Sequence, residues 1–168
     1  MSYDLAVWEG RRPRDNHAAL AVYVQLMDRL EGLSGSPEPA TPAIAAYVRA
    51  LLDRWPDITE KAGEDSPWSA GPLMAEASGN TLYFGMVFSM ADEASEYAAE
   101  LASRHGLVCF DPQLGCLRPF NETDGPPVDV SLPSITCAAC GLLIEVNEPR
   151  AQTFRYDHRP VHLACLDK

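Results

Sequence analysis

Two short segments near the end of the chain constrain its fold more than any other feature. They are Cys137-Ala-Ala-Cys140 and His162-Leu-Ala-Cys165. A Cys-x-x-Cys turn supplies two thiolates from one tight loop, and the second segment adds an imidazole and a third thiolate, which completes the closed ligand set of a structural zinc site. About thirty residues cannot bury a sufficient core alone. We therefore predict that zinc bound by Cys137, Cys140, His162 and Cys165 supplies most of the folding energy of this segment.

Two other interpretations of these cysteines stay open, a redox pair and a chance spacing. A redox Cys-x-x-Cys pair lies at the start of a helix that follows a strand, whereas Gly141 breaks the segment directly after this one. His158 precedes His162 by four residues and could replace it as a ligand. Cys109 and Cys116 lie in strand-like segments, so we expect them to be buried core thiols.

The first two thirds of the chain alternate strand and helix patterns. Asp15 or Asn16, Thr41 and Ser89 are the expected helix caps. The predicted strands cover residues 2–9, 72–78, 81–89, 107–110 and 115–119, and the predicted helices cover residues 17–31, 42–55 and 90–105. This order of elements predicts an α+β domain, in which about three helices pack against a mainly antiparallel sheet.

The composition changes after this domain. Residues 119–133 are rich in proline and aspartate and show no periodicity. We therefore predict three parts: the α+β domain over residues 1–118, a Pro-rich linker over 119–133, and a small zinc-ribbon-like module over 134–168.

Negative charge is concentrated in one stretch of a chain whose net charge is −11. Residues 57–100 carry nine acidic residues and a single base, Lys61. Such a field repels nucleic acid and speeds the encounter with a basic partner, although a solubilising surface would have the same composition. The partner-binding patch that we predict, with an exposed tryptophan as its anchor, consists of Asp57, Glu60, Glu64, Asp65 and Trp68.

Membrane and nucleic-acid functions are not indicated. No apolar run approaches the roughly twenty residues of a membrane span, and no secretory leader pattern is seen. The segment from residue 134 onward carries four acids and four bases, which is not the basic footprint of a nucleic-acid reader. We expect a cytoplasmic protein, where reduced thiols more often hold metal than form disulfides.

The sequence does not predict an enzyme, since it contains no phosphate-binding loop, no Gly-x-Ser-x-Gly elbow and no His-Glu-x-x-His motif. Glu76 stands in an otherwise apolar segment, and we expect it to face solvent at a sheet edge. His105 is expected at a helix end, where it complements the helix dipole. A ligand-sized pocket holding Glu76 or His105 would favour catalysis.

The spacing Cys-x2-Cys-x21-His-x2-Cys over residues 137–165 resembles the first zinc site of LIM and related treble-clef modules. A full LIM domain would continue into a second site. The resemblance implies a structural half-site that mediates protein contacts or caps a fold.

Three other segments resemble small immunity-type proteins of polymorphic toxin systems in high-GC Gram-positive bacteria. They are residues 2–10, residues 65–73, and residues 94–113 with their helix-Gly-strand-Asp-Pro-Gln ending. The resemblance implies an inhibitor, immunity- or antitoxin-like, that neutralises a basic toxin domain, such as that of a secreted toxin, through its acidic surface. The alternative is a zinc-module adaptor or regulator that contacts its partner through the C-terminal segment.

Overall fold

The computed structural model describes residues 2–32, 37–60 and 65–130, together with the backbone of four two-residue strands further on. The chain forms two compact units, Met1–Val128 and Asp129–Lys168. Each unit is described by itself.

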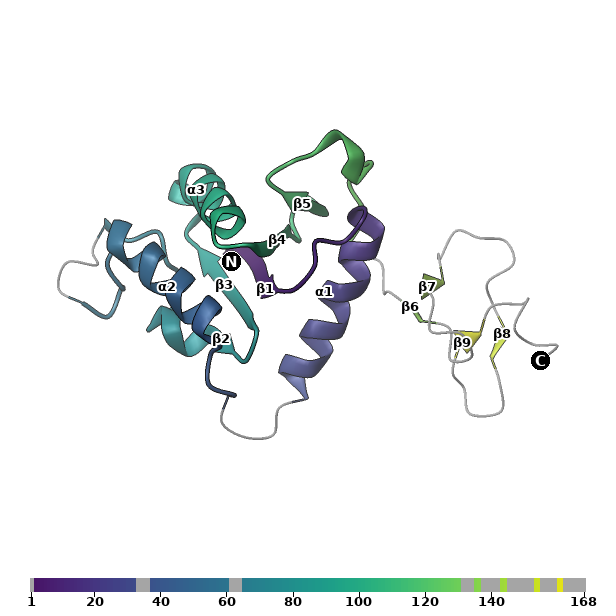
Figure 1. Cartoon of the computed structure of the whole chain (residues 1–168), viewed down its shortest axis with the longest axis horizontal. Coiled ribbons are helices and arrows are strands. Elements are labelled where there is room, and N and C mark those ends of the chain that lie inside the picture. Colours follow the sequence, from purple (N-terminus) through teal and green to yellow (C-terminus); the bar gives the residue numbers. More distant parts are fainter. Residues whose placement is uncertain are drawn as a thin grey trace. The chain divides into compact units, whose positions relative to one another are not determined.

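A five-stranded sheet organises the first unit, and every neighbouring pair of strands is antiparallel. The strand order is β2-β3-β1-β4-β5 (Figure 1). The strands are β1 (Tyr3–Glu9), β2 (Ala77–Ser78), β3 (Thr81–Met86), β4 (Leu107–Asp111) and β5 (Cys116–Arg118). The predicted α+β class with a mainly antiparallel sheet is confirmed for this unit.

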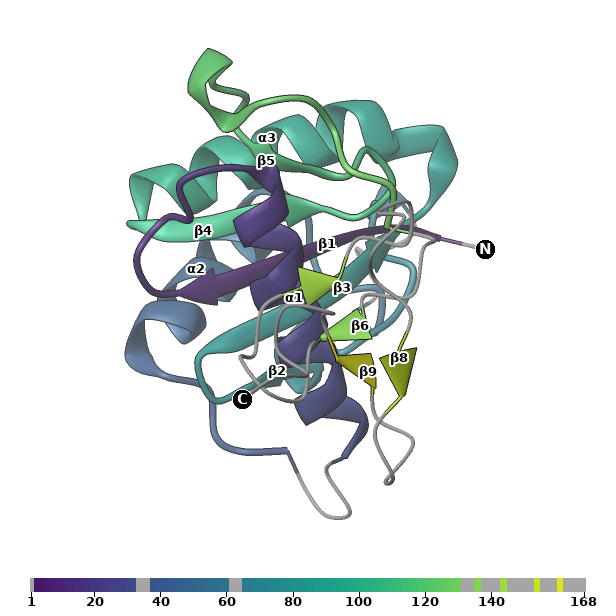
Figure 2. The ribbon, with the colours of Figure 1, turned by 90° about the vertical axis from the view of Figure 1, so that its right-hand side faces the viewer.

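Three α-helices cover the sheet: α1 (Asn16–Glu31), α2 (Pro42–Arg54) and α3 (Ala91–Arg104). Helices α2 and α3 pack together on one face, and α1 crosses the other face (Figures 1 and 2). The described connections include the short 3-10 helices η2 (Leu73–Glu76), η3 (Phe88–Met90) and η4 (Glu122–Asp124).

The main core lies between the sheet and the α2–α3 layer. Alternate residues of each strand point to this face because successive side chains of a strand point to opposite sides. The strands contribute Leu5, Val7, Leu82, Phe84, Met86, Leu107 and Cys109, and the helices contribute Ile44, Tyr47, Val48, Leu51, Ala94, Ala98, Leu101 and Ala102. The small residues of α3 let its backbone lie close to the strands.

Local sequence determines two of the three helix starts. The carboxylate of Asp15 accepts a hydrogen bond from the Ala18 N–H, and the hydroxyl of Thr41 accepts one from the Ile44 N–H. The prediction of a Ser89 cap for α3 is wrong, because Ser89 lies inside η3 and the position before α3 is Met90, which makes no side-chain cap.

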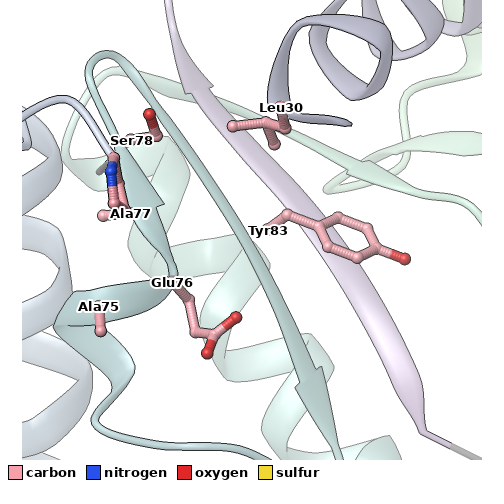
Figure 3. Close-up of a pocket in the computed structure, with 7 residues that line it drawn as sticks. Leu30, Ala75, Glu76, Ala77, Ser78 and Tyr83 are labelled. Carbon is pink, nitrogen blue, oxygen red and sulfur yellow. The ribbon is translucent and has the colours of Figure 1, made fainter. Parts of the chain in front are cut away.

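The strand predicted over residues 72–78 is corrected by the structure. Only Ala77–Ser78 pairs with β3, and the preceding residues form η2, which leads into the strand (Figure 3). The carboxylate of Asp57 accepts a hydrogen bond of 2.6 Å from the Leu73 N–H, and the Ala75 N–H donates to the Pro72 carbonyl. These tertiary and local hydrogen bonds outweigh the strand preference of the apolar residues.

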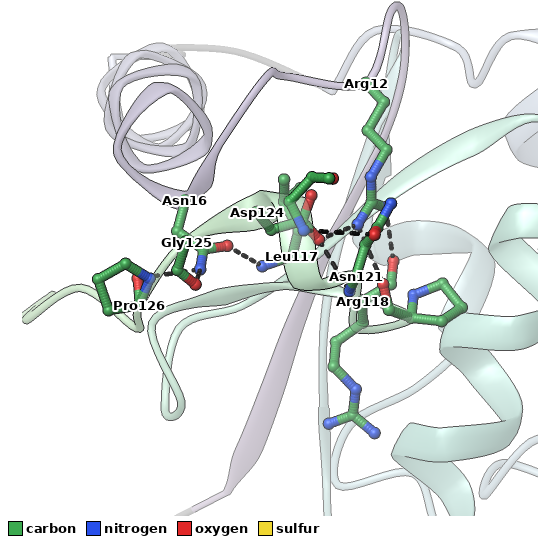
Figure 4. A network of polar contacts seen from close by, with 10 residues as sticks. Arg12, Asn16, Leu117, Arg118, Asn121, Asp124, Gly125 and Pro126 are labelled. Carbon is green, nitrogen blue, oxygen red and sulfur yellow. Dashed lines mark hydrogen bonds and ion pairs between the residues drawn. The ribbon is translucent and has the colours of Figure 1, made fainter.

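The predicted linker is also corrected, because residues 119–128 fold onto the first unit (Figure 4). Arg12 donates to the Asp124 carboxylate at 2.6 Å and to the carbonyls of Arg118 and Pro119. The Val128 N–H donates to the carbonyl of Gly115 at 2.8 Å. The first unit therefore ends after Val128 rather than after residue 118.

Asn16 makes side-chain hydrogen bonds that hold this segment against the first unit. It is 2% exposed, its side-chain oxygen accepts from the Leu117 N–H, and its amide nitrogen donates to the carbonyls of Gly125 and Pro126 (Figure 4). One amide thus joins the start of α1, the edge strand β5 and the returning chain.

Replacing Asn16 by Ala should destabilise the first unit by about 2–4 kcal/mol, since three hydrogen bonds are lost and buried backbone groups are left unpaired. Urea unfolding of the full chain measures this change. The control is Gln25→Ala, an exposed position of the same helix, for which a change within about 0.5 kcal/mol is expected. Equal stability of the two variants would contradict the conclusion that the hydrogen bonds of Asn16 stabilise the first unit.

In the second unit, the backbone forms two antiparallel pairs. β6 (Ile135–Thr136) pairs with β7 (Leu143–Ile144), and β8 (Thr153–Phe154) pairs with β9 (Pro160–Val161). Strands β6 and β9 also contact each other.

Candidate functional site

The predicted tryptophan anchor is not on the surface. Trp68 is 2% exposed and packs edge-to-face against Trp55 and Phe84, with ring centroids 6.0 and 5.7 Å away. Its indole N–H donates to the Trp55 carbonyl at 3.2 Å. The expectation of an exposed anchor is therefore wrong, because the aromatic side chain completes the core beside β3.

Asp57 is also a structural residue. It is 5% exposed, and its two carboxylate oxygens accept from the Leu73 N–H and from the N–H and hydroxyl of Thr59. Burial opposes its charge, yet these backbone and hydroxyl hydrogen bonds prevail and lower the pKa of Asp57 below its ordinary value. This carboxylate organises the loop between α2 and β2 and is not available to a partner.

The remaining members of the predicted patch are acidic side chains only. Glu60 and Asp65 are exposed, and Glu64 lies outside the residues that the structure describes. The compact patch predicted from the sequence is thus reduced to two described carboxylates.

A longer acidic surface runs along α3. Asp92, Glu93, Glu96 and Glu100 are all exposed, at three- and four-residue spacings that place them on the solvent side of the helix. Arg54 of α2 forms an ion pair with Glu93, and the other three carboxylates have no ion-pair partner among the described residues. We call these four residues the α3 acidic surface.

An aromatic cluster borders this surface at the end of α2. The guanidinium of Arg54 lies 4.4 Å from the ring of Trp55 and 4.5 Å from that of Tyr97. The two rings are 5.3 Å apart at nearly perpendicular planes. Since Arg54 already fills this cluster, the cluster fixes α2 against α3 and is not an open binding site.

A pocket of about 270 Å³ lies on the other side of the sheet, beside β2. It is lined by Leu30, Pro37, Ala75, Glu76, Ala77, Ser78 and Tyr83 (Figure 3). Glu76 is exposed, as expected, although on η2 and not on a strand. The Ser78 hydroxyl accepts from the Glu38 N–H at 3.2 Å. No histidine or cysteine is among the lining residues, so the pocket shows no activated nucleophile.

The most buried charged group among the described residues is also fully engaged. Asp111 has no exposed surface, pairs with Arg118 at 3.0 Å and accepts from the Tyr3 hydroxyl at 2.6 Å. It also accepts from the N–H groups of Gln113 and Leu114. Asp111 therefore holds the β4–β5 turn against the start of β1.

The expected core thiols are confirmed. Cys109 is fully buried and Cys116 is 2% exposed. Burial raises the pKa of Cys109 to about 12 and that of Cys116 to about 11. Both thiols stay protonated at neutral pH and have the properties of packing residues rather than nucleophiles.

The predicted zinc ligands Cys137, Cys140, His162 and Cys165 lie outside the described residues, as does the alternative ligand His158. Within the described part of the chain, no three His, Cys, Asp or Glu side chains are grouped closely enough to hold a metal ion. His105 caps the C-terminal end of α3 and packs edge-to-face on Tyr47 at 5.9 Å.

Comparisons of this chain with known protein families, with characterised proteins and with solved structures give no match. Among the described residues, no helix has both the length and the hydropathy needed to cross a bilayer.

Asp57→Asn tests the structural role of this carboxylate. The pKa of Asp57 is lower in the folded state than in the unfolded state, where it is about 3.9. The ionised carboxylate therefore stabilises the fold at pH values above the unfolded pKa, and this stabilisation is lost as the pH falls through the folded pKa. The variant should lose about 2 kcal/mol at pH 7, and the difference from wild type should shrink below about pH 4. Urea unfolding across this pH range measures both.

The matched control is Asp53→Asn, an exposed carboxylate of α2. It should change stability by less than about 0.5 kcal/mol at either pH. A difference for Asp57→Asn that stays constant from pH 7 to pH 3 would contradict the pKa argument.

Proposed function

We propose that this chain is a cytoplasmic protein-binding inhibitor of the immunity or antitoxin type, which neutralises a basic toxin domain and has no catalytic chemistry of its own. The observation that carries the proposal is the α3 acidic surface, a continuous row of four exposed carboxylates. It replaces the predicted patch around Trp68 as the surface that would meet the partner.

Helix stability accounts for only part of this row. Asp92 and Glu93 lie in the first turn of α3, where negative charge interacts favourably with the helix dipole. Glu96 and Glu100 lie beyond that turn and are one helical turn apart, a like-charge arrangement that costs roughly 0.2–0.5 kcal/mol. A binding role would explain two carboxylates that the helix itself does not need.

The helix also presents these charges on a rigid support. Ala94, Ala98 and Ala102, which are completely buried, pack its inner side against the sheet. Charges held in a fixed row steer a basic partner toward one docking face and accelerate association. Preorganised groups also lose little conformational entropy when they bind.

The partner to test is the toxic C-terminal domain of a large secreted protein encoded beside this chain. Co-expression of this chain should restore the growth of a bacterial host that produces the domain. Glu96→Lys/Glu100→Lys should lower the association rate about tenfold at low salt and flatten its salt dependence, as measured by stopped-flow fluorescence.

Asp28→Lys/Glu31→Lys provides the control, with the same charge change at exposed positions of α1. This variant should keep most of the association rate. An equal loss of association rate in the two double variants would mean that net charge alone, and not the α3 acidic surface, sets the rate. The absence of any such neighbouring gene, or of growth rescue, would count against the immunity function.

The second candidate function is that of an adaptor or regulator that makes its contact through a zinc module. The specific support is the backbone of the second unit, in which β6 contacts β9. Cys137 is the residue directly after β6, and His162 is the residue directly after β9. Because each predicted ligand segment begins directly after one of these two strands in the sequence, a single Cys3His site is the arrangement that we propose.

Metal analysis of the purified full chain tests the zinc proposal. We expect one zinc per chain, released by a chelator, and loss of zinc in Cys137→Ser and in His162→Ala. Cys116→Ala, which removes a buried thiol of the first unit, should retain the metal. If zinc were lost in His158→Ala and retained in His162→Ala, His158 would be the histidine ligand. A metal-free protein whose Cys137 and Cys140 oxidise readily would support the redox alternative.

A further inference from the structure

The pocket beside β2 has a consistent chemical character. Its walls are aliphatic, formed by Leu30, Pro37, Ala75 and Ala77, and Glu76 is its single charged lining residue. Its volume of about 270 Å³ is below the roughly 300–1,000 Å³ of sites for drug-sized ligands. Such a pocket has room for one long side chain of a polypeptide.

Glu76 has no interaction partner among the residues that the structure describes. Its carboxylate is exposed and makes no hydrogen bond or ion pair with any described residue. Arg29, the neighbour of Leu30 in the sequence, is already engaged, because its guanidinium donates to the Asn80 side chain and to the Thr81 hydroxyl. The negative charge of the pocket is therefore not neutralised from within the described part of the chain.

Tyr83 adds an aromatic wall. It lies on the face of β3 opposite the main core, half-buried, with its ring 6.5 Å from that of Tyr23 on α1. Burial, with smaller contributions from Tyr23 and Asp4, raises the pKa of Tyr83 well above its ordinary value, so the phenol stays neutral. A neutral aromatic ring and a carboxylate both favour a cation, and the planar guanidinium of arginine suits stacking on a ring.

We propose that this pocket binds an arginine side chain of a partner polypeptide. The aliphatic walls cover the methylene stem, and Glu76, which lines the pocket together with Tyr83, pairs with the guanidinium. This site is separate from the α3 acidic surface, because Tyr83 faces the α1 side of the sheet whereas α3 packs on the other side. The inference therefore stands independently of the function proposed for α3.

The experiment is an NMR titration of the full chain with Nα-acetyl-arginine amide. The amide signals of residues 75–78 and of Tyr83 should shift with a dissociation constant in the millimolar range. Nα-acetyl-norleucine amide, which keeps an aliphatic stem and lacks the charge, should shift them at least fivefold less at the same concentration. Nα-acetyl-lysine amide should bind more weakly than the arginine derivative.

Substitutions test whether the arginine derivative binds in the pocket of Glu76. Glu76→Gln, at an exposed position that should not affect folding, should weaken arginine binding at least fivefold. Glu100→Gln removes the same charge on α3 and should leave arginine binding unchanged. Equal shifts from the arginine and norleucine derivatives, unchanged binding by Glu76→Gln, or shifts centred on α3 would each overturn the proposal.

Discussion

The first unit depends on the burial of β1 at the centre of the sheet. Tyr3–Glu9 pairs with β3 on one side and with β4 on the other, and Leu5, Ala6 and Val7 are completely buried. Because both edges of this strand are paired and both of its faces are covered, its pairing with β3 and β4 fixes the register of the central strands of the sheet. Leu5 and Val7 face α2 and α3 together with the alternate residues of β3 and β4, so a one-residue slip would turn this set away from the core.

The elements that the sequence predicted well are those in which local pattern and tertiary environment agree. The spacing of apolar residues in α2 predicts its buried face, and Thr41-Pro42 marks the residue at which α2 begins. The alternation at residues 3–9 predicts the strand, although Ala6 and Trp8 on its second face are buried as well. The predicted helix at residues 90–105 is also present, although its cap is not Ser89. In each of these cases a short-range pattern is sufficient, since the buried face repeats with the period of the element.

The errors arise where a residue distant in sequence decides the outcome. Residues 73–76 are apolar enough for a strand, yet Asp57, sixteen positions away, accepts from the Leu73 backbone and favours a turn of 3-10 helix. Residues 119–128 have the composition of a linker, yet Arg12 and Asn16 hold them. Trp68 next to acidic residues suggested an exposed anchor, and nothing local indicates that it completes the core. Such contacts become visible only in the folded chain.

The separation of the two surfaces has a consequence for recognition. The α3 acidic surface and the pocket of Glu76 lie on opposite sides of the sheet, with the core between them, so their contributions to binding should be nearly independent. A compact partner that docks on α3 cannot fill the pocket by the same rigid contact. An extended basic segment of that partner could reach it, and the second contact would then form at the high effective concentration of a tethered ligand. Charge on α3 would thus govern the rate of encounter, while the pocket would govern how long the complex lasts.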